Sequence, residues 1–493
     1  MNVIEAAQAG DLEWARTHDW KLLIGGELRD AAGGATYENE SPLTRSTFCS
    51  VPDAQTSDVD DAVAAAKDAY RVWREVPVRE RGAIVRDIGR VLREHREELA
   101  VLDAIDVGNT VSSMLGDADM GIGSLEYMAD HAMSLGGEVI PAGSTHFNYT
   151  RYEPYGVTAR IVAFNHPTLY ATMKIAAPLV AGNALIFKPS DASPLTALWV
   201  GELIKDLLPK GLFSVVVSKG IETSRAIVRH PDIRRIGFIG SPATGMSIQR
   251  DAAEVAVKNI SLELGGKNAV IVYPDMDLDV AADIVVRGMN FSGWQSQSCG
   301  STTRLFAHDD IADELVAKVA AKVAELRIGS PFDPETAMGS MATRAQFDKA
   351  LGYIEIATSE GATLVAGGTA VDDESGYFVR PTIFDHVSPT SRLATEEVFG
   401  PVLAAIRWHD EEEMIDQVNS LRYGLTGSVC SSDFWKAQRM VHRIESGHVW
   451  INDASTHFIG VPFGGFKDSG VGREESVEEL LSYAQLKAVN VRL

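Results

Sequence analysis

The sequence predicts an α/β protein in which a doubly wound parallel β-sheet is followed by a second α/β domain. Between residues 155 and 274, short apolar runs end at Gly or Pro turns, and helical patterns separate most of them. Such runs are typical of strands buried on both faces, and repeated strand–helix–strand units form parallel sheets covered by helices. At 493 residues the chain is too long for one hydrophobic core, so two or three domains are expected.

Two amphipathic helices are expected ahead of the sheet. The first begins at Ser57, an N-cap residue with Asp60 three positions later, and carries apolar residues at helical spacing as far as Trp73. The second, over residues 81–105, has an Arg- and Glu-rich face that we interpret as solvated, and it ends near Gly108.

The strands of the sheet are predicted at short apolar runs. These are residues 158–164, 183–187, 213–217, 235–239 and 268–273. Ligands of doubly wound sheets bind at the carboxyl ends of the strands, so the residues after each run are the first candidates for a site. Further strand and helix patterns over residues 305–449 predict the second α/β domain.

The composition favours a cytoplasmic protein without nucleic-acid or membrane partners. Its 68 acidic and 45 basic side chains give a net charge of -23, which repels nucleic acid and anionic membranes. No apolar run reaches the roughly 18 to 20 residues that span a bilayer, and the first residues do not form a signal peptide. Cys49, Cys299 and Cys430 are widely separated, so neither disulfides nor a catalytic metal are expected.

Two motifs at strand ends fit a dinucleotide. In KPSD, Lys188 and Asp191 could grip a ribose diol, with the carboxylate repelling a 2′-phosphate and so favouring NAD over NADP. A surface ion pair is the alternative interpretation. In GSPATG, residues 240–245, Ser241 and backbone N–H groups at a helix start could meet a pyrophosphate, whereas a plain turn is the alternative.

Two further segments carry candidate catalytic groups. LELGGKN, residues 262–268, places Glu263 inside an apolar run, where burial would raise its pKa toward that of a general base. An exposed or ion-paired glutamate is the alternative. FSGWQSQSCGSTTR, residues 291–304, places Cys299 in a small, polar segment that suits a nucleophile better than an inert core thiol.

Together these segments resemble the aldehyde dehydrogenase superfamily, in its NAD(P)-dependent, hydrolytic branch. The resemblance runs through nearly the whole chain and preserves the order of the motifs. They are FNHP at 164–167, KPSD at 188–191, GSPATG, LELGGKN, SQSCG at 296–300, EEVFGPV at 396–402 and PFGGFKDSGVGRE at 462–474.

The resemblance implies a division of the chain into a Rossmann-like cofactor domain, an α/β catalytic domain and a small oligomerisation element. The cofactor domain comprises residues 1–131 and 155–264, and the catalytic domain 265–468. A β-hairpin at 132–154 and a return segment with a C-terminal strand at 469–493 would assemble a homodimer or homotetramer.

The resemblance also implies oxidation of an aldehyde to a carboxylic acid. Cys299 would attack the carbonyl while the Asn165 amide and the Cys299 backbone N–H stabilise the oxyanion. Hydride would leave for the nicotinamide, and a water activated by Glu263 would hydrolyse the thioester. NAD is the expected cofactor. NADP is the alternative, because the family usually has glutamate where this chain has the shorter Asp191.

The cofactor contacts implied by the resemblance are spread over the motifs. Lys188 and Asp191 would hold the adenosine ribose, Ser241 the pyrophosphate, Glu397 the nicotinamide ribose and Phe399 the nicotinamide ring. The remaining cofactor positions are Phe164, Gly220, Gly240, Gly245, Leu264 and Gly265.

The substrate pocket implied by similarity mixes aromatic rings with a few polar tips. Its residues are His166, Tyr170, Met173, Trp294, Ser298, His457, Phe458 and Phe463. No arginine lies near Met173, where relatives that oxidise anionic semialdehydes often have one. We therefore expect an uncharged aromatic or medium aliphatic aldehyde, with an aminoaldehyde or semialdehyde as the alternative.

Three other functions compete with this one. Coenzyme A could resolve the thioester in place of water, but Glu263 argues against that branch. A non-catalytic binding protein could share the fold, but Cys299, Asn165 and Glu263 are all present. Ester hydrolysis by the same thiol is a plausible side activity.

Overall fold

A mixed eight-stranded sheet organises the first half of the computed structural model, which describes residues 2–371 and 375–493. Its centre is parallel, and antiparallel strands close both edges. The strands, in spatial order, are β2 (Glu27–Arg29), β1 (Leu22–Ile24), β9 (Phe213–Val215), β8 (Ala184–Lys188), β7 (Val157–Ile161), β10 (Ile233–Gly240), β11 (Asn259–Leu264) and β21 (Gly470–Val471).

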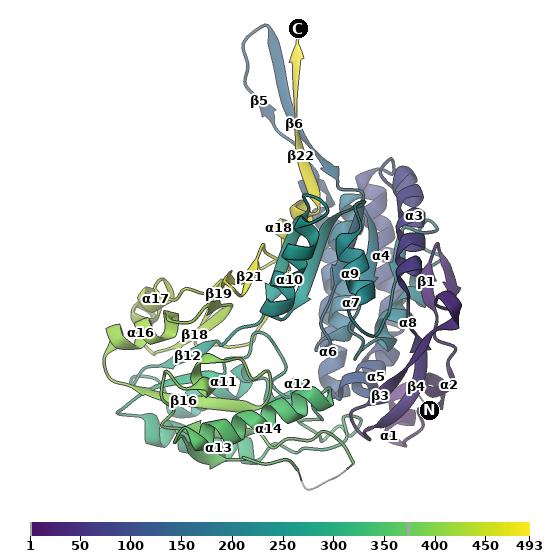
Figure 1. The fold of residues 1–493 in the computed structure, drawn as a ribbon. Coiled ribbons are helices and arrows are strands. Elements are labelled where there is room, and N and C mark those ends of the chain that lie inside the picture. Colours follow the sequence, from purple (N-terminus) through teal and green to yellow (C-terminus); the bar gives the residue numbers. More distant parts are fainter. Residues whose placement is uncertain (1, 372–374) are drawn as a thin grey trace.

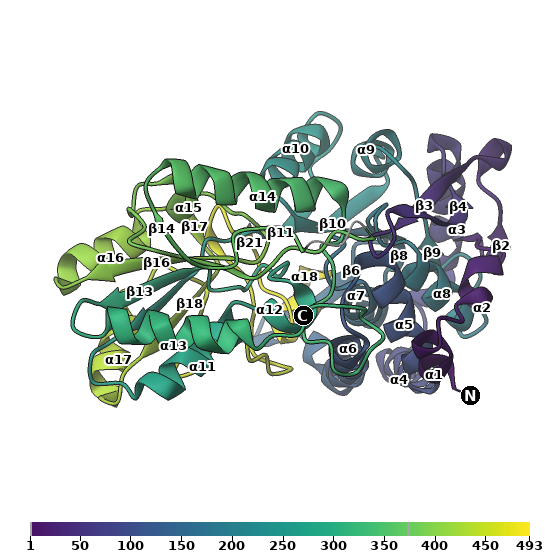
Figure 2. The same ribbon diagram turned by 90° about the horizontal axis from the view of Figure 1, so that it is seen from below.

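Helices cover both faces of this sheet, as the predicted doubly wound fold requires. On one face lie α3 (Thr56–Trp73), α9 (Glu222–Arg229) and α10 (Pro242–Ala253), and on the other lie α7 (Pro167–Ala181) and α8 (Leu195–Ile204) (Figure 2). Outside α7 and α8 pack α4 (Val78–Glu94), α5 (Arg96–Val107) and α6 (Val111–Asp130). Two strand–helix layers of this kind confirm the α/β class.

The second sheet is seven-stranded and parallel except at one edge. Its strands are β14 (Thr363–Ala366), β15 (Thr382–Asp385), β16 (Val402–Trp408), β13 (Arg304–His308), β12 (Ala269–Val272), β18 (Thr426–Cys430) and β19 (His448–Ile451). Its principal helices are α11 (Leu278–Gly288), α13 (Ala312–Ala324), α14 (Arg344–Ser359), α16 (Glu411–Asn419) and α17 (Phe434–Val441). The run at 268–273, expected in the first sheet, therefore belongs to the second, because an apolar run does not specify which sheet it joins.

Short N-terminal and linking elements complete the body. An antiparallel pair, β3 (Thr36–Ser41) and β4 (Ser46–Pro52), packs beside α5 and α2 (Glu13–Thr17). The remaining short elements are α1 (Val3–Gln8), α12 (Phe291–Trp294), α15 (Arg392–Thr395), β17 (Tyr423–Gly424), β20 (Phe466–Lys467) and α18 (Val477–Ser482), together with the 3₁₀ turns Ala32–Gly34 and His131–Leu135.

Two predicted helix boundaries were wrong. The first helix has Gln55 rather than Ser57 as its N-cap, because the Asp58 carboxylate accepts a hydrogen bond from the Gln55 backbone N–H at 2.8 Å. The stretch 81–105 is broken at His95 into α4 and α5, since His95 leaves the helical conformation and caps both. The predicted end is confirmed, because Gly108 caps α5 in the left-handed conformation with φ 74°.

A three-stranded arm projects from the body (Figure 1). It pairs β6 (His146–Pro154) with β22 (Ala484–Arg492) antiparallel over its whole length, and β5 (Val139–Ile140) adds to β6. The residues predicted to form a hairpin and a C-terminal strand thus lie in one three-stranded sheet.

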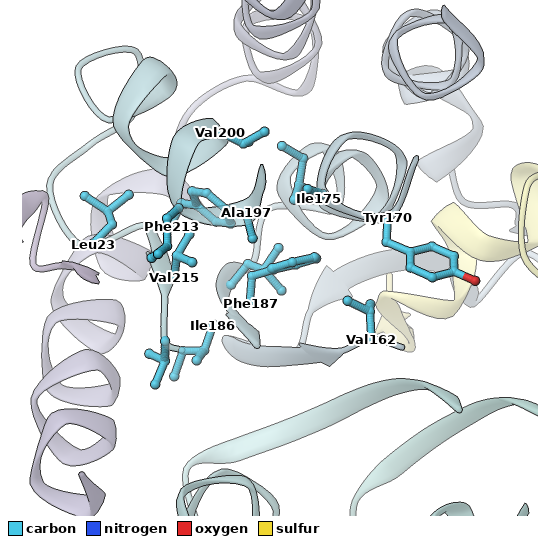
Figure 3. Close-up of a cluster of buried hydrophobic side chains, with 14 of the residues drawn as sticks. Leu23, Val162, Tyr170, Ile175, Ile186, Phe187, Ala197, Val200, Phe213 and Val215 are labelled. Atoms are coloured by element: carbon cyan, nitrogen blue, oxygen red, sulfur yellow. The ribbon is translucent and has the colours of Figure 1, made fainter. Parts of the chain in front are cut away.

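The core beneath the first sheet extends directly toward the strand ends. Figure 3 shows Phe187 of β8 surrounded by Ile175 of α7, Ala197 of α8 and Phe213 of β9, all of them buried. At the edge of this cluster stands Tyr170, whose ring is buried while its hydroxyl points out of the apolar cluster. Core packing therefore fixes a polar group at the carboxyl edge of the sheet.

None of the helices in residues 2–371 and 375–493 has both the length and the apolar character to cross a membrane.

Candidate active site

The predicted catalytic residues converge where the carboxyl ends of the first sheet face the second. Asn165 follows β7, Glu263 lies near the end of β11, and Cys299 stands in the loop between α12 and β13. All three border one cavity of about 130 Å³. A second cavity of about 250 Å³ is bordered by Glu263 and Cys299 as well. The thiol and the carboxylate therefore stand at the junction of two cavities, where two ligands could meet.

The loop that carries Cys299 has an unusual backbone held by side-chain hydrogen bonds. Gln295 and Ser296 adopt φ values of 52° and 56°, in the left-handed region that non-glycine residues seldom occupy. Asn268 clamps the following turn, since its Nδ2 donates to the Cys299 carbonyl at 2.7 Å and to the Ser301 carbonyl at 2.9 Å. These two hydrogen bonds hold the backbone of the loop at Cys299 in one conformation.

The Cys299 thiol lies deep in the molecule but keeps part of its surface open to the cavities. Burial raises its pKa well above the usual value, and the charge of Glu263 raises it further, while the Gly300 backbone N–H acts in the opposite direction. The thiol therefore favours its protonated form, and it must lose its proton before it attacks an electrophile.

Glu263 has the environment predicted for a general base. Its side chain is buried, and its Oε1 has no hydrogen-bond partner among the residues that the structure describes. Burial raises its pKa well above 4.5, and Glu474 adds to the rise, whereas Lys174 counteracts it. A carboxyl group without a protein partner, held near both cavities, is available to exchange a proton with water or with the thiol.

Asn165 is held by one hydrogen bond to its backbone and one to its side chain. The Asn109 Nδ2 donates to the Asn165 backbone carbonyl at 2.9 Å, and the Tyr170 hydroxyl donates to the side-chain Oδ1 of Asn165 at 3.2 Å. Because its oxygen is occupied, Asn165 has its Nδ2 donors left for a ligand oxygen. Tyr170 thus links the apolar core to the orientation of this amide.

A buried ion cluster behind Glu263 was missed by the sequence analysis. Lys174 Nζ lies 2.8 Å from Glu474 and 3.5 Å from Glu479, and Arg160 also pairs with both carboxylates. Burial alone would raise the pKa of Glu474, but Arg160 and Lys174 outweigh it and lower that pKa to about 2. A lysine within the apolar α7 sequence was the available signal, since a buried amine requires a carboxylate partner.

Residues predicted to bind the nicotinamide end of the cofactor line the smaller cavity. The rings of Phe164 and Phe399 meet edge to face with centroids 5.9 Å apart, and the Gly266 backbone N–H donates to Glu397 Oε1 at 2.9 Å. Predicted cofactor residues on this cavity are Phe164, Gly240, Ser241, Leu264, Gly265, Glu397 and Phe399. The aromatic rings and the carboxylate on the wall of this cavity could hold a nicotinamide and its ribose, so we call the cavity the nicotinamide slot.

The other predicted cofactor residues lie away from this cavity. Lys188, at the end of β8, is buried and donates to the Pro189 carbonyl at 3.0 Å, while Asp191 is exposed nearby. Gly220 is exposed with φ 86°, and Gly245 is buried in the first turns of α10. The adenosine half of a dinucleotide would have to extend across this surface toward Lys188 and Asp191.

The larger cavity contains most of the predicted substrate residues. Those on its wall are His166, Tyr170, Trp294, Ser298, His457 and Phe463. Met173 is 1% exposed and does not line it. His166, the N-cap of α7, and Tyr170 and Lys174 within the helix face the cavity at four-residue spacing, whereas Met173 lies on another side of the helix. Phe458 is also off the wall, with 64% of its surface exposed.

Helix α6 supplies a wall of this cavity that the sequence did not indicate. Ser113, Gly116, Asp117 and Met120 border it, and so does Glu475. Asp117 Oδ2 lies 2.8 Å from His166 Nδ1 and also accepts from Trp294 Nε1 at 3.4 Å. No local motif surrounds these residues, and only the packing of α6 on α7 brings them to the site.

A cysteine and a buried carboxyl group stand together at the junction of a substrate-sized cavity and a nicotinamide-sized slot. This arrangement is the one expected of an NAD(P)-dependent oxidoreductase. The aldehyde dehydrogenase family matches residues 29–489, and the chain belongs to this family. The resemblance to this family, the enzyme class and the use of NAD(P) are confirmed, and the chain is an NAD(P)-dependent aldehyde dehydrogenase.

Relatives support the assignment along the whole chain. Aldehyde dehydrogenase tropH of Talaromyces stipitatus is 43% identical over 486 residues, covering 97% of this chain and 93% of that protein. The structure of betaine aldehyde dehydrogenase from Staphylococcus aureus with NAD+ has a TM-score of 0.95 at 32% identity, covering 99% of this chain and 98% of that one. The NAD+ complex of aldehyde dehydrogenase from Bacillus cereus has a TM-score of 0.95 at 34% identity, covering 98% of each chain.

Enlarging Gly265 should weaken cofactor binding. A Cβ at this position would lie 2.3 Å from Glu397 Oε2, so Gly265→Ala must displace the carboxylate that accepts from Gly266. Because a hydrogen bond to a charged group is lost, we expect KM for NAD to rise about tenfold or more. Gly352→Ala is the control, since no atom lies within 4 Å of its added Cβ. An unchanged KM in Gly265→Ala would remove Glu397 from the cofactor site.

Proposed function

We propose that this enzyme oxidises an uncharged aromatic or medium aliphatic aldehyde to its carboxylic acid, with NAD as acceptor, through a thiohemiacetal and a thioester on Cys299. The observation that carries the proposal is the position of Cys299 and Glu263, which border both the nicotinamide-sized slot and the substrate-sized cavity. Asp191 at the end of β8 supports NAD over NADP, since it would repel a 2′-phosphate.

The first half of the reaction forms the thioester. The Cys299 thiol releases its proton to water, and the thiolate then adds to the aldehyde carbon. The resulting oxyanion accepts hydrogen bonds from Asn165 Nδ2 and the Cys299 backbone N–H. A bound nicotinamide supplies the acceptor for the hydride that leaves this carbon. Phe164, Phe399 and Glu397 would hold the ring and its ribose against the cysteine.

The second half releases the acid. Glu263 takes a proton from water, the hydroxide adds to the thioester carbon, and the C–S bond breaks to return the Cys299 thiolate. Water is expected to reach Glu263 because its Oε1 has no protein partner in the described part of the chain. The sum is aldehyde, NAD+ and water giving carboxylic acid, NADH and a proton.

The charges on the cavity wall favour an uncharged substrate. Each of three wall carboxylates already has a basic partner: Asp117 has His166, Glu474 has Lys174, and Glu475 has His457 at 3.3 Å. Of the carboxyl groups that the structure describes on the cavity wall, Glu263 is the one without a basic partner, and its raised pKa favours its neutral form. No arginine is among the described residues that border the cavity, which argues against an anionic semialdehyde.

An aminoaldehyde is the second candidate. The Staphylococcus aureus relative is a betaine aldehyde dehydrogenase, and aromatic rings such as Trp294 and Phe463 can bind a quaternary ammonium group by cation–π contact. Because the carboxylates on the cavity wall already have basic partners, an aminoaldehyde is the weaker of the two candidate substrates.

Offering a panel of aldehydes with NAD tests the proposal. Benzaldehyde and hexanal represent the favoured class, and betaine aldehyde and succinic semialdehyde the cationic and anionic alternatives. We expect kcat/KM at least about tenfold higher for the uncharged pair, because an unpaired charge in the cavity costs upward of ~1.4 kcal/mol. NADH absorbance is the readout, and a higher kcat/KM with betaine aldehyde would reverse the order of the two candidates.

We also propose that the arm makes the enzyme a homodimer or homotetramer. Apolar side chains on it are left exposed, among them Val139 at 67% and Leu486 at 60%. The outer edges of a small sheet with apolar residues are suited to a second copy of the same sheet.

A further inference from the structure

We propose that Asp117 and His166 form a specificity element that binds a hydroxyl group on the substrate, so that the preferred substrates are hydroxylated aromatic aldehydes. This inference rests on the proposed function, because it names the substrate class of that same cavity. The two residues come from different elements, α6 and the N-cap of α7.

Asp117 fixes both the orientation and the tautomer of His166. Its Oδ2 lies 2.8 Å from His166 Nδ1, and Trp294 Nε1 donates to the same oxygen at 3.4 Å. A carboxylate can only accept, so Nδ1 carries the proton and Nε2 of a neutral imidazole is left as an acceptor. Asp117 and His166 are nearly buried, so this arrangement is shielded from bulk water.

The free nitrogen of His166 faces the reacting centre. His166 Nε2 lies 3.4 Å from Ser298 Oγ, and both residues border the larger cavity. His166 directly follows Asn165 in the chain and Ser298 directly precedes Cys299. A substrate whose carbonyl meets Asn165 and Cys299 therefore has its nearby ring substituents beside Nε2 and the serine hydroxyl.

The rest of this wall is suited to an aromatic ring. The His166 ring lies 5.5 Å from Trp294 and 5.8 Å from Tyr170, and the His457 ring lies 4.9 Å from Phe463, all measured between centroids. Such distances are typical of aromatic packing, and a cavity of about 250 Å³ can admit a substituted benzene ring.

An unsubstituted ring would leave the polar groups poorly satisfied. Between His166 Nε2 and Ser298 Oγ the separation of 3.4 Å is long for a hydrogen bond, and an apolar substrate would exclude the water that could improve it. A phenolic hydroxyl can donate to Nε2 and accept from Ser298. The site therefore discriminates by leaving two partly buried polar groups with only their long contact to each other when the hydroxyl is missing.

The kinetic test compares benzaldehyde with 2-, 3- and 4-hydroxybenzaldehyde. In the wild-type enzyme we expect at least one hydroxylated isomer to exceed benzaldehyde by roughly 10- to 100-fold in kcat/KM. His166→Phe should keep the ring packing and reduce that ratio to about one, and Asp117→Asn should lower it because the amide no longer dictates the tautomer. His95→Gln removes another histidine–carboxylate pair, 2.7 Å from Glu98, and should leave the ratio unchanged.

A binding measurement separates failure of this inference from failure of the proposed function. Calorimetric titration with benzyl alcohol and the three hydroxybenzyl alcohols needs no turnover. Tighter binding of a hydroxylated alcohol, lost in His166→Phe, supports the specificity element even if no aldehyde is oxidised. Equal affinity for all four alcohols in the wild-type protein, or equal losses for all of them in His166→Phe, would show that the pair only joins α6 to α7 and would overturn the inference.

Discussion

Cys299→Ala is expected to reduce NADH formation with every aldehyde by at least about 10⁴-fold, because no second nucleophile can form the thioester. The other thiols, Cys49 and Cys430, are buried away from both cavities, and burial raises the pKa of each to about 12. Initial rates at the NADH absorbance band give the result directly. The KM for NAD should change little, since the nicotinamide slot does not depend on the thiol.

Two controls accompany this variant. Cys49→Ala removes a buried thiol of the same kind and should retain wild-type kinetics if the protein remains folded. Circular dichroism of both variants establishes that the fold is intact. Aldehyde oxidation by Cys299→Ala at more than about one hundredth of the wild-type rate would contradict covalent catalysis through this cysteine, since a nucleophile's removal costs far more.

The fold class and the convergence of the candidate catalytic residues on one cavity could be predicted because their signals are local. A strand followed by its functional residue, as in β11 with Glu263 near its end, occupies a few consecutive positions, and a parallel sheet then brings such ends to one edge. Cys299 was identifiable because its small polar neighbours are unsuited to core packing. In each case the sequence neighbourhood itself constrains the structure.

The missed features depend on contacts between distant segments. Asp117 reaches His166 only because α6 packs on α7, and Lys174 finds Glu474 across most of the chain. Met173 was predicted to line the cavity but is buried away from it, because the resemblance to a family does not specify which face of a helix borders the cavity. The shape of the cavity therefore depends on tertiary packing. The sequence predicts the kinds of side chain on the wall better than it predicts which residues form that wall.

Glu263→Gln is expected to stop the enzyme after the thioester. Attack by Cys299 and hydride transfer would still occur once, so mixing enzyme, NAD and aldehyde should release NADH equal to the number of active sites. Steady-state kcat should then fall by about 10²- to 10⁴-fold, the usual contribution of a general base. Rapid-mixing absorbance measures the burst and the steady rate together, and Glu254→Gln, an exposed glutamate paired with Arg229, is the matched control.

The pH dependence follows from the raised pKa of Glu263. Its base form exists only above that pKa, so wild-type kcat should fall as pH decreases through a value well above 4.5. Between 4.5 and the raised pKa the folded protein binds a proton that the unfolded chain has released, so this carboxyl group lowers stability as pH rises through that window. Glutamine cannot ionise, so the Glu263→Gln variant does not lose stability in this way as pH rises. The thermal midpoint of Glu263→Gln relative to wild type should therefore increase with pH, and a difference that stays constant from pH 5 to 9 would show that Glu263 ionises as easily in the folded enzyme as in water.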